Sequence, residues 1–427
     1  MKNNFKLLLI TASADGIKKI RKSRVVRFQQ VTMPYLAALT PSNWTVFHFD
    51  EECEEIDYNM SVDLVGITFH TPSANHVYEI SSIFRQKGIP VVLGGPHVTL
   101  IPDEAINHAD TIIIGEADDI WAQFIHDFEM GESKKVYMPE NTPTLENRPF
   151  ARKDIFHRKD FSNGILVATR GCPNACEFCA LSVMYKNTFR KRPVEEVAQE
   201  YGSFKGKVII FWDDNITSDI QYAKQLFRKI TPYKKWWSSQ VSIHAGQDEE
   251  LLELAAKSGC KQLFIGLESI SQNSLNNINK SFNRVEDYYK IIKRIQSFGI
   301  SVQVGIVFGF DHDNKSIFNE TIDFLESAGV QNATFNILTP YPGTPLFKRL
   351  EAENRILTYD WDKYNGRADV VYLPKNMSCK ELLGGFNLVN KRFYSLNSVI
   401  KRLSKSRAGL WWTLPLNLAY HFSYRFK

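Results

Sequence analysis

The 427-residue sequence has no apolar run that reaches the roughly 18 residues of a membrane-spanning helix. The apolar stretch in its first residues, MKNNFKLLLITAS, is interrupted by Asp15 too soon for a secretory signal. Six cysteines are too few for a disulfide scaffold, and three of them fall within eight residues, which points to metal binding. We therefore expect a cytoplasmic protein with reduced thiols.

Acidic residues are missing from the end of the chain. Residues 391–427 contain eight Lys or Arg and no Asp or Glu, whereas the other 390 residues hold 44 basic and 47 acidic groups. Because the body is slightly acidic, we expect no nucleic-acid partner. The tail also holds eight aromatic residues. One interpretation is peripheral contact with an anionic membrane surface. The other is a C-terminal helix that docks on the protein and presents its charges to water.

Short apolar runs alternate with helical patterns along the chain, which is typical of βα units and a parallel sheet. In the first third, apolar runs predict strands at residues 6–10, 64–69, 91–93 and 111–114. A helical pattern over 77–84 ends at Gly88. Continuous apolar strands indicate helices on both faces of the sheet. The pattern predicts a doubly wound, Rossmann-like α/β domain over residues 1–135.

The rest of the chain divides into three further parts. Residues 136–163 contain three prolines and are predicted to form a linker. Six more strands are then expected, at residues 165–169, 208–212, 240–243, 262–265, 302–308 and 333–338. Since a closed barrel of this kind uses eight βα units, six units predict a partial (β/α)6 barrel of TIM type over residues 164–350. Residues 351–427 are expected to be a C-terminal extension.

Three cysteines directly follow the first predicted barrel strand. The segment TRGCPNACEFCAL places Cys172, Cys176 and Cys179 at C-x3-C-x2-C spacing. A structural zinc site is the alternative, but it needs four ligands, and the sequence has no second C-x2-C pair. Thiolates also hold iron–sulfur clusters, and three ligands leave one iron of a four-iron cluster open.

This triplet resembles the signature of the radical S-adenosylmethionine (SAM) superfamily, in which an aromatic residue precedes the third cysteine, as Phe178 does here. The resemblance implies a [4Fe-4S] cluster on Cys172, Cys176 and Cys179, with SAM bound at the open iron. It also implies an external electron donor of the flavodoxin or ferredoxin type.

The strand ends of the predicted barrel supply further residues, since sites in such barrels form at the carboxyl ends of strands. By the same resemblance, the SAM-binding residues are Phe178, Asp214, Glu268, Lys280 and Gly305. The acidic run FWDDN has a second interpretation, in which its side chains cap the helix that begins near Ser218.

Two short motifs follow strands of the first domain. GGPHVT begins at Gly94 after the third predicted strand, and GEAD begins at Gly115 after the fourth. Ligands of open α/β sheets bind at the carboxyl ends of strands, where paired glycines let a large, flat ligand lie against bare backbone. No G-x-G-x-x-G fingerprint is present, which argues against a nicotinamide or flavin nucleotide.

Here the chain resembles the cobalamin (B12)-binding domain that precedes the barrel in many radical SAM enzymes, through GITFHTP, LGGPHVTLIPDEAINHAD and the GE pair. The cobalamin-binding residues implied by this resemblance are Thr71, Gly94, Gly95, Pro96, His97, Gly115 and Glu116. No D-x-H-x-x-G occurs, so the usual histidine ligand to cobalt has no candidate. We interpret His97 as a hydrogen-bonding loop residue. A domain that kept the fold and lost the cofactor is the alternative.

The two resemblances together imply an enzyme that uses a [4Fe-4S] cluster, SAM and cobalamin to methylate an unactivated carbon of a small-molecule or lipid-type substrate. One alternative keeps the cofactors but acts as a cyclase, oxidase or dehydratase without methyl transfer. An alternative of another class is an iron–sulfur binding or assembly protein. Methylation would yield S-adenosylhomocysteine and 5′-deoxyadenosine together, which separates the first two hypotheses.

Overall fold

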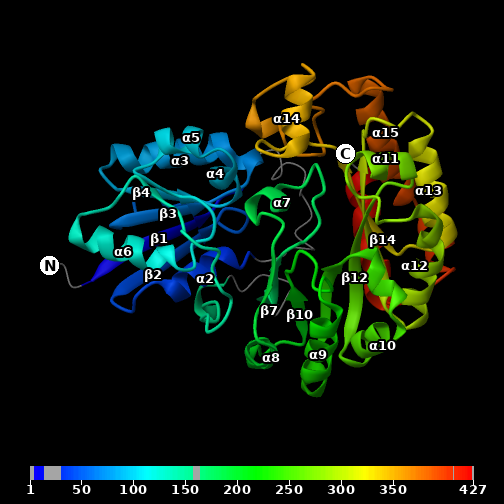
Figure 1. Ribbon diagram of the computed structural model, residues 1–427, viewed down its shortest axis with the longest axis horizontal. Helices are drawn as coiled ribbons and strands as arrows, with labels where there is room; N and C mark the ends of the chain where they lie inside the picture. Colours follow the sequence, from blue (N-terminus) through cyan, green and yellow to red (C-terminus); the bar gives the residue numbers. More distant parts are fainter. Residues whose placement is uncertain (1–3, 14–29, 157–163, 407, 426–427) are drawn as a thin grey trace.

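The computed structural model describes residues 4–13, 30–156, 164–406 and 408–425. It contains two six-stranded parallel sheets, each with its own helices, and a C-terminal group of helices beside the second sheet (Figure 1). The strand order is β2-β1-β3-β4-β5-β6 in the first sheet and β14-β13-β12-β11-β10-β7 in the second. The expected α/β architecture is therefore confirmed.

The first sheet is covered by helices on both faces. Its strands are β1 (Phe5–Thr11), β2 (Trp44–Asp50), β3 (Leu64–Thr68), β4 (Val91–Gly94), β5 (Thr111–Ile113) and β6 (Val136–Tyr137). Helices α2 (Thr32–Leu39) and α6 (Ile120–Met130) pack on one face, and α3 (Ala74–Gln86), α4 (Pro96–Leu100) and α5 (Pro102–Ala105) on the other (Figure 1). Because β2 and β3 lie on opposite sides of β1, the strand order reverses there, as in the predicted doubly wound fold.

Two strands of this sheet have no counterpart in the sequence prediction. The edge strand β2, WTVFHFD, carries His48 and three aromatic residues and pairs only with β1. The two-residue strand β6 pairs with β5 and lies in the segment expected to be a linker. Both strands are at sheet edges, where a continuous apolar run is not needed because fewer neighbours cover the strand.

The second sheet curves without closing, since β7 and β14 lie at its two edges. Its strands are β7 (Gly164–Leu166), β10 (Val208–Phe211), β11 (Trp236–Val241), β12 (Cys260–Glu268), β13 (Ser301–Phe308) and β14 (Asn332–Ile337). The helices between them are α8 (Val194–Ser203), α9 (Ile220–Ile230), α10 (Glu249–Lys257), α11 (Gln272–Asn277), α12 (Tyr288–Ser297) and α13 (Ile317–Ala328). This is the partial barrel that six βα units predict.

The third barrel strand was misplaced by the sequence prediction. It begins at Trp236 rather than at residue 240, and Ile243 already belongs to a 3₁₀ turn. Ser238 and Ser239 interrupt the apolar run that would otherwise mark the strand. Along β11, buried residues alternate with partly exposed ones. Successive side chains of a strand point to opposite faces of the sheet, so the buried residues share one face and the partly exposed residues share the other.

The segment that carries the cysteines adds a small hairpin. Strand β8 (Thr169–Gly171) pairs antiparallel with β9 (Phe189–Lys191), and α7 (Ala180–Met184) lies between them. The strand expected at residues 165–169 is thus divided between β7 and β8. The 3₁₀ turns are η1 (Thr71–Ser73), η2 (Ile106–His108), η3 (Lys153–Ile155), η4 (Thr231–Tyr233), η5 (Ile243–Gln247), η6 (Val285–Asp287) and η7 (Trp361–Lys363).

The C-terminal extension contacts both domains. Trp361, Tyr364 and Val371 join the apolar core of the first domain. The helices are α14 (Pro345–Ala352), α15 (Cys379–Phe393), α16 (Leu396–Leu403) and α17 (Leu410–Arg425). Phe393 and Tyr394 complete the barrel core, so the tail docks as one sequence interpretation expected; Arg407, Phe426 and Lys427 lie outside the described residues. In the described chain, the helices are too short or too polar to cross a bilayer.

Candidate active site between the two domains

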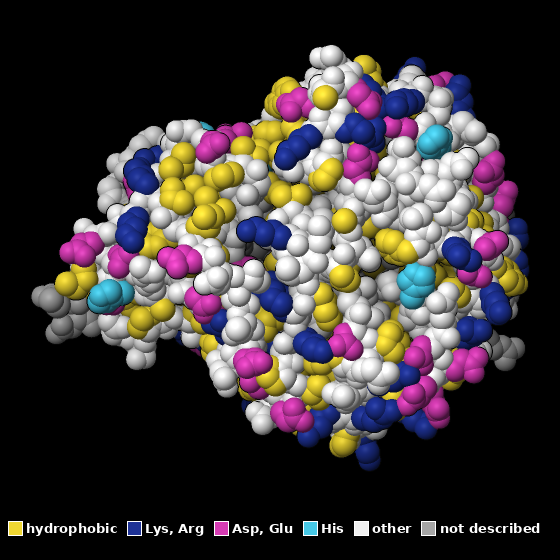
Figure 2. Space-filling view, viewed as in Figure 1, with side chains coloured by type: hydrophobic (Ala, Val, Ile, Leu, Met, Phe, Trp, Pro, Cys, Tyr) yellow, Lys and Arg dark blue, Asp and Glu magenta, His cyan; other side chains and the backbone are white. Residues whose placement is uncertain are grey.

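A cavity of about 550 Å³ lies where the carboxyl ends of both sheets meet. Its walls from the first domain follow β1, β3, β4 and β5 and include Thr11, Thr68 and Gly94. Its walls from the barrel include Trp212 and Asp214. Figure 2 shows a small opening in the surface at the junction of the two domains. Both domains therefore offer the edge at which parallel sheets bind ligands.

Five of the predicted cobalamin-binding residues line this cavity: Gly94, Gly95, Pro96, Gly115 and Glu116. Gly95 has φ +99°, and a Cβ there would lie 2.4 Å from Thr68 Oγ1 and 3.0 Å from the Phe69 nitrogen. No side chain fits at this position without moving the backbone of the neighbouring strand end. The wall here is bare main chain, which fits a broad, flat ligand such as a corrin.

Thr71 and His97, the other two residues of that set, do not line the cavity. The His97 side chain is fully buried, with Nδ1 3.2 Å from Thr71 Oγ1 and Nε2 3.4 Å from Glu104 Oε1. Its ring also packs against the edge of Trp361. His97 therefore joins the loop after β4 to the C-terminal extension, in agreement with its interpretation as a hydrogen-bonding residue.

The three cysteines lie on the loop between β8 and α7. Cys176 is buried, and Cys172 and Cys179 are partly exposed. The loop is closed by a hydrogen bond from the Cys179 nitrogen to the Cys176 oxygen (3.1 Å). It is held from outside as well, because the Glu177 nitrogen donates to the Ile278 oxygen (3.1 Å). These backbone bonds hold the main chain of the cysteine loop in place. Phe178 points to the barrel core, 6.2 Å from the Phe310 ring.

Burial opposes ionisation of two of the three thiols, those of Cys176 and Cys179. Burial raises the pKa of Cys176 to about 11, although the nearby Lys280 acts against this rise. Burial also raises the pKa of Cys179, and the N–H groups of Leu181 and Ser182 oppose it. Among the described residues, no three His, Cys, Asp or Glu side chains converge on a point where one metal ion could sit. Three soft sulfur donors spread along one loop suit a cluster, which takes one thiolate per iron.

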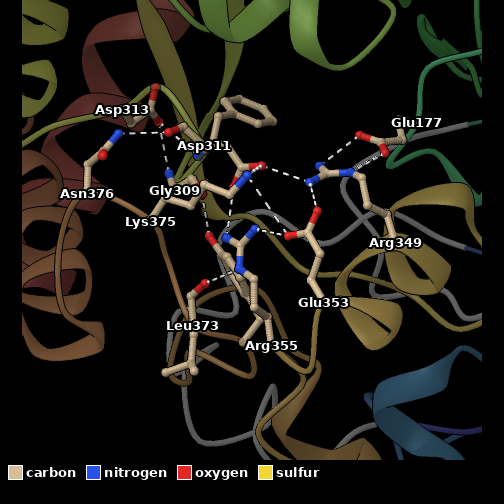
Figure 3. Close-up of polar contacts among 12 residues, drawn as sticks. Glu177, Gly309, Asp311, Asp313, Arg349, Glu353, Arg355, Leu373, Lys375 and Asn376 are labelled. Carbon is tan, nitrogen blue, oxygen red and sulfur yellow. Dashed lines mark hydrogen bonds and ion pairs between the residues drawn. The ribbon is translucent and has the colours of Figure 1, made fainter.

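Glu177, between the second and third cysteines, ties this loop to the C-terminal extension (Figure 3). Its carboxylate accepts from Arg349 Nε (2.6 Å) and Nη2 (3.1 Å). Arg349 Nη1 in turn donates to Asp311 Oδ2 (2.8 Å), which Arg355 and Lys375 also contact. Burial would raise the pKa of Asp311, but the arginines lower it to about 2. The sequence analysis did not find this network.

Glu268 and Lys280 form an ion pair of 2.7 Å beside the cysteines. Glu268 has φ +65°, and the β12 register shifts between Gly266 and Glu268, which turns its side chain toward Lys280. A Cβ at Gly266 would lie 2.4 Å from Glu268 Oε1, so this glycine leaves room for the pair. Gly305 is the register partner of Gly266 on β13. The structure thus brings together three of the predicted SAM-binding residues, and an ion pair can exchange its partners for the ammonium and carboxylate of a ligand.

The acidic run after β10 does not cap the following helix, so that interpretation is wrong. Asp219 caps α9 instead, because its Oδ1 accepts from the Tyr222 nitrogen (2.9 Å). Asp213 is fully buried and accepts from the Thr169 nitrogen and hydroxyl, and its burial raises its pKa to about 7. These bonds join the end of β10 to the strand that leads into the cysteine loop.

Asp214, predicted to bind SAM, lies in the cavity wall. Its Oδ2 accepts from the Gly171 nitrogen (2.9 Å), directly before Cys172. Burial raises its pKa, and the charge of Arg170 opposes this rise. The residue therefore holds the start of the cysteine loop.

Four charged residues connect the domains across the cavity wall. Arg170 Nη1 donates to Glu116 Oε1 (2.7 Å) and Asp118 Oδ2 (2.6 Å). Arg190 Nη2 donates to the other oxygen of Glu116 (2.6 Å). Sequence reasoning proposed Glu116 as a cobalamin contact and missed the other three. The only local signal was the pairing of an acidic loop, GEAD, with a basic hairpin that contains TRGC and FRKR.

Comparison with known proteins finds a family match for each of the two domains. Residues 166–325 match the model of the radical SAM superfamily, and residues 35–125 match that of the B12 binding domain. Over 403 residues, the chain is 31% identical to bacteriochlorophyllide d C-12(1)-methyltransferase from Chlorobaculum tepidum, which covers 90% of this chain and 88% of the relative. The chain belongs to the cobalamin-binding radical SAM enzyme family. The cofactors expected from the sequence, a [4Fe-4S] cluster, SAM and cobalamin, are those of this family.

A second relative supports this family, and a solved structure shares the fold. It is 31% identical over 353 residues to bacteriochlorophyllide d C-8(2)-methyltransferase of the same organism, over 77% of this chain and 78% of the relative. Its fold resembles that of TsrM, a radical SAM methyltransferase from Kitasatospora setae, with a TM-score of 0.69 and 16% identity over 82% of this chain and 78% of that one.

Proposed function

We propose that the protein is a cobalamin-dependent radical SAM methyltransferase that adds a methyl group to an unactivated carbon of a tetrapyrrole. The observation that carries the proposal is the 31% identity to a bacteriochlorophyllide d methyltransferase over 90% of the chain, because a match of that extent takes in both domains. A second relative, also 31% identical, is a methyltransferase for another position of bacteriochlorophyllide d.

The cavity supports a large, apolar substrate. Leu36 of α2 contributes from the first domain, and Leu181 and Met184 of α7 from the barrel, with Trp212 beside them. Apolar side chains from both domains thus face one space, which suits a flat macrocycle that has to approach both cofactors. The alternative of a lipid-type substrate fits the same walls and is an outcome of the assay below.

We propose the following residues as those that would hold the cofactors, supported by the contacts described above. Cys172, Cys176 and Cys179 would ligate three irons, and Glu268 with Lys280 would receive the ammonium and carboxylate of SAM. Gly94, Gly95 and Gly115 would lie against the corrin, as the bare main chain there suggests. When bound, the cluster with SAM supplies a radical, and cobalamin supplies the methyl group. The protein itself orients these groups and keeps water from the cavity.

The test is an anaerobic assay of cluster- and cobalamin-loaded protein with bacteriochlorophyllide d, SAM and a flavodoxin-type reductant. We expect a product heavier by one methyl group, with S-adenosylhomocysteine and 5′-deoxyadenosine formed in equal amounts to it. A parallel assay offers an isoprenoid lipid in place of the tetrapyrrole. Formation of 5′-deoxyadenosine without S-adenosylhomocysteine would contradict methyl transfer and favour a cyclase or oxidase. Full cluster loading with no SAM cleavage would favour a binding or assembly protein.

A further inference from the structure

Helix α17 exposes a row of three apolar side chains on one side. Its buried side carries Asn417, whose Nδ2 donates to the Gln331 oxygen (3.0 Å) and Asn332 Oδ1 (2.9 Å) at the start of β14. On the other side, Trp411, Leu414 and Phe422 are 60%, 44% and 55% exposed. Steps of three and eight residues place these three side chains on one face of a helix. Such a row is more than scattered surface apolar residues.

Unpaired cations border the Trp411 end of this row. The Trp411 ring packs edge-on against Trp236 at 4.8 Å between ring centres. Lys207 Nζ and Lys261 Nζ lie 4.5 Å and 5.9 Å from the centre of the Trp236 ring. Neither ammonium has a carboxylate partner within the described part of the chain. Two lysines and two indoles therefore share one small area of the surface.

A second pair of lysines lies near the turn that leads into α17. Lys293 Nζ donates to the Lys405 backbone oxygen (3.3 Å). Burial and the charge of Lys405 lower the pKa of Lys293, so the two like charges repel each other. The tail from residue 391 onward contributes no carboxylate to balance them. The surroundings of the helix are thus electropositive.

This surface lies at the end of the barrel opposite the cavity. Lys207 directly precedes β10, Trp236 begins β11, and Trp412 Nε1 contacts Ser301 Oγ at the start of β13 (3.3 Å). These are amino ends of parallel strands, whereas the cavity is at the carboxyl ends. A partner bound here leaves the cavity free.

We propose that this surface, consisting of Trp411, Leu414, Phe422, Lys207 and Lys261, docks on an anionic lipid bilayer. The apolar row of α17 enters the headgroup region, and the lysines lie against lipid phosphates. A second copy of the chain fits worse, because a two-fold contact would place the same lysines against each other. The helix lies on the bilayer and does not cross it. The proposal does not depend on methyl transfer.

The experiment is flotation of the full-length protein with vesicles of phosphatidylcholine alone or mixed with phosphatidylglycerol. We expect binding only to the mixed vesicles, weakened by about fivefold for each lysine removed, as in Lys207→Gln with Lys261→Gln. Trp411→Ser with Phe422→Ser should abolish flotation. Met138→Ser, which changes a 61% exposed side chain on the first domain, is the matched control and should float like the wild type.

Thermal unfolding of each variant shows that the fold is intact, since none of these side chains is buried. Raising the salt concentration should release the protein, because the lysine contribution is electrostatic. Equal flotation of wild type and both double variants would overturn the proposal. So would a wild-type dimer in sedimentation that Trp411→Ser with Phe422→Ser converts to a monomer without any vesicle binding.

Discussion

The two domains build opposite walls of one cavity by different means. In the first, the strand order reverses beside β1, and the strand ends that reach the cavity carry small residues such as Gly95. In the second, strands follow in chain order, and ionisable side chains lie at or near their ends, such as the buried Asp213 and the Glu268–Lys280 ion pair, whose side chains are 13% and 12% exposed. On the proposed function, the first domain would make room for a ligand, and the second would hold ligands by charge and sulfur. Substitutions in the first domain should therefore act by adding side-chain volume to the cavity wall. Substitutions in the barrel should act by removing a charge or a ligand.

The largest effect is expected from Cys176→Ala in the barrel. Loss of one of three thiols should abolish the iron–sulfur absorption and all SAM cleavage, while corrin absorption persists because the first domain is untouched. Cys260→Ala is the control, since this cysteine is buried far along the chain from the loop. Iron content measured per folded protein decides the outcome; equal iron in both variants would contradict the assignment of the ligand.

The Glu268–Lys280 ion pair of the barrel is tested next with Lys280→Met. This change leaves Glu268 buried without its partner and should cost about 3 kcal/mol of unfolding free energy. SAM affinity should fall at least about tenfold, because the SAM carboxylate would lose a charged hydrogen-bond donor. Adding Glu268→Gln should restore much of the stability but not the SAM affinity. Recovery of both would mean that the pair is only structural.

The cavity wall of the first domain is tested with Gly95→Ala. The new Cβ would lie 2.4 Å from Thr68 Oγ1, so the loop after β4 has to move and cobalamin binding should weaken by about tenfold. Gly88→Ala is the matched control, because Gly88 also has a positive φ (+73°) but nothing within 4 Å. It should cost about 1 kcal/mol of stability and leave cobalamin binding unchanged. A titration followed by corrin absorbance measures cobalamin binding in both variants.

The junction of the two walls is tested with Arg170→Gln. Glu116 and Asp118 lose their shared cation, so the domains should hold together less rigidly while each still binds its cofactor. We expect the ratio of 5′-deoxyadenosine to methylated product to rise several-fold. Arg152→Gln, which removes an arginine paired with Asp154 at the surface, is the control. An unchanged ratio in both variants would show that the ion network has no role in coupling.

The last prediction concerns pH and stability rather than the cavity. Burial raises the pKa of Asp313 to about 6, although Ser274 and two backbone N–H groups donate to it. The folded state then binds a proton that the unfolded state releases, so this group lowers stability as the pH rises from about 4 to about 6. Relative to Asp313→Asn, the wild type should lose about 1.4 kcal/mol per pH unit in that window. Urea unfolding at several pH values measures the difference.

The sequence predicted the parts of the molecule whose signal is local. Central strands such as β13 are continuous apolar runs, and the cysteine ligands lie within eight residues of one another. The edge strand β2 and the serine-containing β11 lack such runs and were missed or misplaced. Contacts between distant residues could not be paired from the sequence: Arg170 and Glu116 are 54 positions apart, and Arg349 and Glu177 are 172 apart. Which acid meets which arginine is decided by the packing of the domains, not by the neighbouring sequence.

The Glu177–Arg349 contact also orders the events of biosynthesis. A ribosome releases the cysteine loop long before it has made residue 349, so the emerging loop lacks the guanidinium that fixes its middle. Cofactor insertion then belongs after translation of the extension rather than during synthesis of the barrel. A chain that stops short of α14 would keep the backbone bonds of the cysteine loop but would lack the guanidinium on Glu177, so we expect its thiols to be oxidised by air more readily.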